Sequence, residues 1–155
     1  MRSYKIWGSA LIAVVAAAAG IWLAFGQGNG ALAGANADDR ELVTVGRSVY
    51  AKACASCHGA KLEGEKNWKQ RKADGTFGAP PHDATGHTWH HPDALLFRIT
   101  KLGGAAVMPA GSKSGMPAFK DQYSDREIWA VLAYIKSRWP TRVREIHARI
   151  NKRNR

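Results

Sequence analysis

Charged side chains are absent from one long stretch near the start of the chain. Residues 6–25 are predominantly apolar and carry no charge, whereas residues 1–5 contain Arg2 and Lys5. At about 1.5 Å of rise per residue, a helical run of this length spans a bilayer. Because positive residues stay inside, the pattern predicts a transmembrane anchor at 6–25, a cytoplasmic segment at 1–5 and export of everything that follows.

A cleaved secretory signal is the alternative for this segment. Such a signal has an apolar region of only about 7 to 15 residues, so the length favours a retained anchor, although 31–33 and 35–37 offer small-x-small cleavage patterns. An anchor would hold the domain on the periplasmic side of a bacterial inner membrane, and cleavage would leave it soluble in the periplasm. Residues 26–37 are uncharged and rich in Gly, Ala and Asn, which is typical of a flexible linker.

From residue 38 to residue 140, the apolar positions indicate an all-α domain. Two segments, 41–53 and 124–135, repeat apolar residues at helical spacing. A capping box begins the second segment at Ser124, and Pro140 ends it. Between the two segments, the pattern predicts loops and one short helix.

Gly46 lies in the middle of the first predicted helix. A glycine there costs about 1 kcal/mol relative to alanine, which indicates that another helix crosses closely at this position. Val131 and Tyr134, three residues apart in the last predicted helix, are expected to meet Gly46 and Tyr50. The sequence therefore predicts a crossed pair of terminal helices.

The residues between these helices divide into two parts. Residues 59–79 are rich in charged residues and contain several glycines, so an exposed loop is expected there, anchored against the core by Trp68 and Phe77. A short helix is expected at 94–99, with the Asp93 side chain accepting from its first free amides.

The charge of the chain constrains its partners. The formal net charge is +11 and the isoelectric point is about 10.1, which favours an acidic redox protein or the acidic face of a membrane oxidoreductase complex. Nucleic acid is not expected, because the chain lacks zinc-finger spacing and a pattern of stacking aromatics with Arg, and because its amino terminus directs it out of the cytoplasm.

The segment at 141–155 is strongly basic. Val143, Ile146 and Ile150 recur at helical spacing, so the tail can form a basic amphipathic helix on an anionic membrane surface or an acidic partner. A solvated, frayed tail is the alternative. The charged residues of the tail are Arg142, Arg144, Glu145, Arg149, Lys152, Arg153 and Arg155.

The two cysteines of the chain lie in one motif, Cys54-Ala55-Ser56-Cys57-His58. Such a pair can be a redox disulfide, half of a zinc site or the attachment point of a c-type haem. A zinc site needs two further ligands at short spacing, and a thioredoxin-like motif belongs near a strand–helix–strand pattern. Neither context is present, so the motif indicates one covalent haem c with His58 directed at the iron.

Iron in such a site takes a second axial ligand. Met116, Met108 and the downstream histidines are the candidates, and a thioether raises the reduction potential relative to an imidazole. Met116 is favoured over Met108, because Gly115 lets the chain turn, Pro117 stiffens it and Phe119 can pack beside the porphyrin.

Histidines are concentrated between residues 82 and 91. Imidazole is a good ligand for zinc or copper, but the spacing and the neighbouring prolines oppose a second metal site. His82, His87 and Trp89 are instead expected to wall the haem crevice or to donate to its propionates, and His90 and His91 are expected at the surface.

Taken together, these motifs resemble class I c-type cytochromes, the small monohaem carriers, over about residues 40–139. The resemblance implies crossed terminal helices, axial ligation by His58 and Met116, and a proline carbonyl, best matched by Pro80, that orients the ligand histidine. It implies single-electron transfer. The alternatives are a haem enzyme of the peroxidase or nitrogen-oxide reductase type, supported by the histidine-rich segment, and a tethered haem subunit of a larger oxidoreductase complex.

Overall fold

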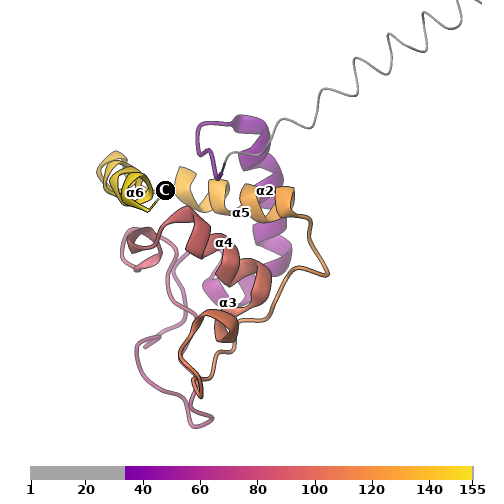
Figure 1. The fold of residues 1–155 in the computed structure, drawn as a ribbon, viewed down its shortest axis with the longest axis vertical. Helices are drawn as coiled ribbons and strands as arrows, with labels where there is room; N and C mark the ends of the chain where they lie inside the picture. The colour runs from indigo at the N-terminus through magenta and orange to yellow at the C-terminus, as the bar shows by residue number, and fades with distance from the viewer. Residues whose placement is uncertain (1–33, 155) are drawn as a thin grey trace, which may run out of the picture. The chain divides into compact units, whose positions relative to one another are not determined.

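Five α-helices and two short 3-10 helices form the part of the chain that the computed structural model describes, residues 34–154 (Figure 1). The predicted anchor at 6–25 lies outside these residues. No helix within 34–154 combines the length and apolar character needed to cross a bilayer. In chain order, the helices are α2 (Arg40–Ala53), α3 (Ala55–His58), η2 (Thr88–His90), α4 (Asp93–Leu102), η3 (Gly104–Val107), α5 (Asp125–Ser137) and α6 (Thr141–Arg153).

The crossing of α2 and α5 forms the centre of the domain (Figure 1). A Cβ atom added to Gly46 would collide with the carbonyl of Ala130 and would lie 3.0 Å from the Cβ of Tyr134. The rings of Tyr50 and Tyr134 pack with their centroids 5.4 Å apart. The predicted crossing at Gly46 is therefore confirmed, with Ala130 rather than Val131 as the closest neighbour.

Local sequence signals account for the start of α5 but not for the start of α4. The Ser124 side chain accepts from the Glu127 amide while the Glu127 carboxylate accepts from the Ser124 amide, which is the predicted capping box. The prediction that Asp93 caps α4 is wrong, because Pro92 occupies that position and makes no side-chain cap bond. The Asp93 carboxylate instead pairs with Lys136 at 2.7 Å.

The packed region extends beyond both ends of the predicted domain. Ala35 is buried together with Leu42 and Leu96, so packing begins within the predicted linker. Beyond Pro140, α6 is a regular helix that packs against η2. This matches the helical alternative for the basic tail.

The loop at 59–79 is held by one of its two expected anchors. Trp68 stacks on His87, with ring centroids 5.2 Å apart. Phe77 is 41% exposed and lies beneath the Arg71 guanidinium, so the expectation that it packs into the core is wrong.

Candidate functional site

The motif residues lie at the carboxyl end of α2, where the chain turns into the single-turn helix α3. The amides of Cys57 and His58 both donate to the carbonyl of Cys54, at 3.1 and 2.9 Å. The buried Tyr50 hydroxyl donates to the carbonyl of Gly59 at 2.8 Å and lies 3.3 Å from that of His58. The last turn of α2 therefore fixes both ends of the motif.

Both thiols are free. Cys57 is exposed and Cys54 is half-buried. Burial, with a smaller contribution from the neighbouring Cys57, raises the pKa of the Cys54 thiol to about 11. The thiol is therefore protonated at neutral pH, and the pair stands one helical turn apart, as attachment to a single planar group requires.

The imidazole of His58 is buried and oriented by one strong contact. Its Nδ1 lies 2.8 Å from the carbonyl oxygen of Pro80, and because a carbonyl only accepts, Nδ1 carries the proton. Burial lowers the pKa of His58, against a smaller opposing effect of the Pro80 bond. The result is a neutral ring whose Nε2 lone pair is available to a metal.

Pro80 is held in place by backbone bonds on either side. The Glu65 amide donates to the carbonyl of Ala79 at 2.8 Å, and the His82 amide donates to that of Leu62 at 2.8 Å. Leu62 is buried and has a φ of 71°. The backbone turn at Leu62, which gives no sequence signal of its own, thus positions the Pro80 carbonyl.

His82 packs face to face on His58, with ring centroids 4.0 Å apart. Burial lowers the pKa of His82 well below its ordinary value, and its Nδ1 lies 2.8 Å from the Thr88 hydroxyl. A ring stacked on the face of His58 lies beside that imidazole and not across from its Nε2. His82 therefore cannot be the ligand opposite His58.

The remaining expected wall residues lie at different depths. His87 is exposed and covered by Trp68. Trp89 packs against the core cluster that contains Tyr50 and stacks on His90 at 3.7 Å. The structure thus brings His82 against His58 and places His87 at the surface.

Met108 and Met116 are each followed by a proline, and only the segment around Met116 is hydrogen-bonded to the core. Met116 is half-buried, its carbonyl accepts from the Gly104 amide at 3.1 Å, and the amide of the buried Phe119 donates to the Thr100 carbonyl at 3.2 Å. Met108 is exposed. Backbone bonds to the end of α4 therefore position Met116 and leave Met108 in an exposed loop.

The chemistry of these donors fits haem c better than a bound metal ion. Within residues 34–154, no cluster of three or more His, Cys, Asp or Glu side chains could hold a metal ion. Two free thiols one turn apart, followed by a neutral, oriented imidazole, are instead the groups that attach and ligate a haem.

Comparison with known proteins agrees with this chemistry. A family model described as cytochrome C oxidase, cbb3-type, subunit III matches residues 41–135, which is more than half of the chain. Neither the curated proteins nor the solved structures contain a match. The matched region extends from α2 almost to the end of α5, and α6 lies beyond it.

Proposed function

Because the chain belongs to the cytochrome c oxidase, cbb3-type, subunit III family and so contains a class I cytochrome c domain with one covalent haem c, we propose that it transfers single electrons on the periplasmic side of a bacterial inner membrane. When bound, haem c supplies one iron centre that alternates between the ferric and ferrous states. The bond between His58 Nδ1 and the Pro80 carbonyl is the observation that carries the proposal.

We assign the individual residues as follows. Cys54 and Cys57 would hold the haem covalently, and His58 and Met116 would bind its iron. Pro80 fixes the tautomer and orientation of His58, and His82 restrains its ring by stacking.

An electron carrier is favoured over a haem enzyme. A peroxidase or reductase needs an exchangeable ligand position with an acid or base beside it. The backbone bonds that hold the segment around Met116 favour a ligand position that this methionine fills. His87 lies at the surface with Trp68 stacked on its ring, so it is poorly placed to exchange protons with a substrate at His58.

The family also favours a second, related role as a tethered haem subunit. Its description names a subunit of an oxidase, so we propose that a membrane oxidoreductase complex is the electron partner. The basic loop at 59–79 would then approach an acidic face of that complex or of a smaller acidic redox protein.

Expression of the full chain in cells that attach haem c tests the proposal. The denatured protein should stain for haem, should titrate as a single one-electron centre and should remain in carbonate-washed membranes. The C54S/C57S variant should lose the stain and the H87S control should keep it. Absence of covalent haem from the unaltered chain would refute electron transfer, whereas its release from membranes would refute only the anchor.

Purification in a mild detergent tests the partner. Oxidase subunits should accompany the protein and should separate from it as the salt concentration rises. A haem-loaded protein that purifies alone at low salt would leave the electron-carrier role standing and would refute the subunit role.

A further inference from the structure

Helix α6 is docked on the domain by a largely buried polar network. Asp93 is 20% exposed and pairs with Lys136, which is 13% exposed. The Asn151 side chain of α6 accepts from the Asp93 amide at 2.7 Å and donates to its carboxylate at 3.0 Å. His147, 1% exposed, has its Nε2 3.0 Å from the carbonyl of His91. These contacts fix the rotation of α6 about its own axis.

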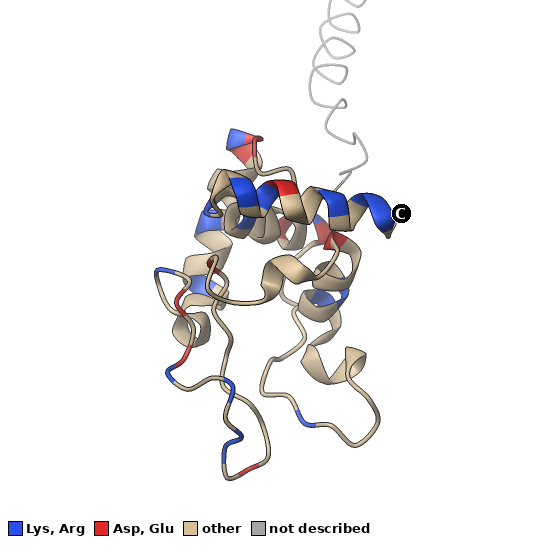
Figure 2. Ribbon diagram, turned by 90° about the vertical axis from the view of Figure 1, so that its left-hand side faces the viewer, with Lys and Arg blue, Asp and Glu red and all other residues tan. Residues whose placement is uncertain are grey.

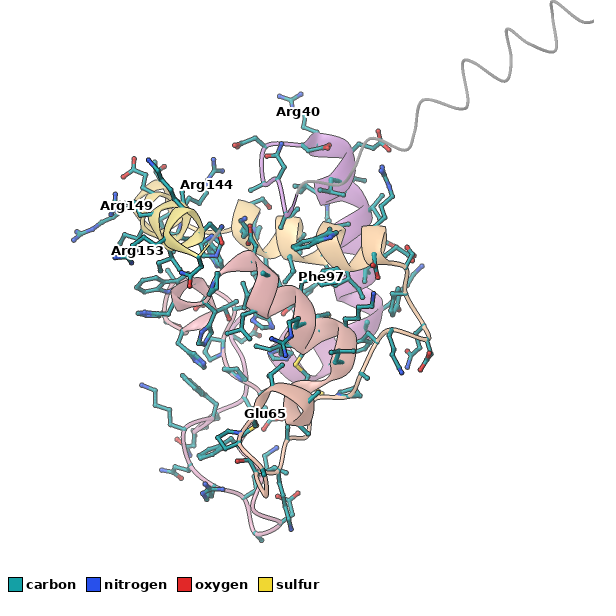
Figure 3. The ribbon with its side chains drawn as sticks, in the orientation of Figure 1. Arg40, Glu65, Phe97, Arg144, Arg149 and Arg153 are labelled. Carbon is teal, nitrogen blue, oxygen red and sulfur yellow. The ribbon has the colours of Figure 1, made fainter. Side chains whose placement is uncertain are left out.

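The fixed rotation turns a cationic strip of α6 toward solvent. Four basic side chains and one acidic side chain are exposed on this face, and Figure 2 shows the blue segments repeating along the helix. In Figure 3, Arg149 extends away from the rest of the domain. The charged residues of the strip are Arg142, Glu145, Arg149, Lys152 and Arg153.

The start of the described chain lies against the same helix. Asp38 pairs with Arg144 of α6 at 2.8 Å, and a groove runs between residues 35–38 and α6. A Cβ atom on Gly34 would lie 3.8 Å from the Asp93 carboxylate. The described part of the chain therefore begins beside α6, on the flank of the helix that adjoins the strip.

Chain length then limits which face can approach a membrane. Eight residues separate the predicted span at 6–25 from Gly34, and they extend at most about 28 Å. A domain of this size has a radius of gyration of about 14 Å, and thus a diameter of about 35 Å. The linker is shorter than the domain is wide, so the face beside Gly34 stays closest to the bilayer.

We propose that the exposed strip of α6 lies on the anionic lipid surface of the membrane that holds the anchor. The match in charge and the short tether carry this inference, which rests on the proposed anchor and is independent of the haem ligands. Contact there orients the domain and leaves the basic loop at 59–79 free for a redox partner.

Spin labels on the full-length, haem-loaded protein in vesicles test this contact. A148C places a label on α6 at the exposed edge of the groove, next to Arg149 of the strip, and A73C places one in the exposed loop as the control. In vesicles whose lipid is about one-third phosphatidylglycerol, the A148C label should be about threefold less accessible to a water-soluble nickel chelate than in vesicles of pure phosphatidylcholine. Addition of about 0.5 M salt should reverse this loss of accessibility. The A73C label should not change.

Charge variants separate lipid contact from other causes. R149E/R153E should restore the accessibility of the A148C label, whereas R47E/R98E, which changes the net charge equally on α2 and α4, should not. Unchanged A148C accessibility in anionic vesicles would overturn the proposal, as would protection that persists in R149E/R153E. Haem staining and the redox titration report separately on electron transfer.

Discussion

The proposed ligation of the haem iron by Met116 makes a spectroscopic prediction. M116A should remove the thioether, abolish the weak methionine–iron charge-transfer band and lower the reduction potential by on the order of 0.1 V. Visible spectroscopy and a redox titration of the loaded protein measure both effects. M108A is the matched control, because Met108 is exposed, and it should behave like the unaltered protein. The reverse pattern would assign the ligand to Met108.

At the scale of single residues, the sequence predicted the chemical groups of the site better than it predicted where their neighbours lie. The sequence alone restricts the geometry of the Cys54–His58 motif, since four consecutive peptide bonds separate its ends and it follows directly on the end of α2. The stacking of His82 on His58 and the left-handed turn at Leu62 depend on tertiary packing. The sequence indicates a helix cap at Asp93 because an Asp that follows a proline is typical of the position before a helix. Its observed role, pairing with Lys136 and Asn151, depends on residues that are distant in the sequence.

The crossing of α2 and α5 sets the framework at the scale of the elements. G46V should push the helices apart, because an added Cβ meets the backbone carbonyl of Ala130, which cannot move aside. The loss should be about 2 kcal/mol or more, despite a better helix propensity. Denaturant unfolding measures it. G115A is the control, since a Cβ there meets nothing within 4 Å. Equal stability of G46V and the unaltered protein would contradict the crossing.

The docking of α6 should depend on pH through His147. Burial lowers the pKa of His147 despite the opposing attraction of Asp93, 3.6 Å away, because Lys136 already neutralises that carboxylate. The unfolded chain then takes up the proton first, near pH 6.5. Stability from this group is therefore complete above about pH 6.5 and is lost as the pH falls, by at most about 1.4 kcal/mol per pH unit.

Unfolding followed by circular dichroism between about pH 8 and pH 5 checks this effect. The H147Q variant should show a flatter pH profile, and the difference between the two profiles isolates His147 from the neighbouring Asp93, Lys136 and His91. Parallel profiles would contradict the assignment. The sequence did not predict this packing, because the composition of a basic tail suits a solvated segment as well as a helix and does not mark His147 as buried.

Over the whole molecule, the net charge of +11 should set the direction in which salt changes the rate of electron transfer. In Figure 2, the blue positions of Lys and Arg recur along both the loop at 59–79 and α6. The loop is the one that adjoins the site, through the bond between the Glu65 amide and the Ala79 carbonyl. Oxidation of the reduced protein by anionic hexacyanoferrate(III) should therefore slow about tenfold between about 10 mM and 500 mM ionic strength. Oxidation by cationic tris(phenanthroline)cobalt(III) should accelerate.

Local charge, rather than net charge, should decide the size of this effect. K66E/K69E on the exposed loop should slow oxidation by hexacyanoferrate(III) about threefold or more at low salt, because the anion is attracted by charge close to the site. R142E/R149E changes the net charge equally on α6 and should have little effect. Stopped-flow kinetics compare the two variants. Equal slowing by both would mean that the anion responds only to the total charge, and the loop would then lose its role in steering the partner.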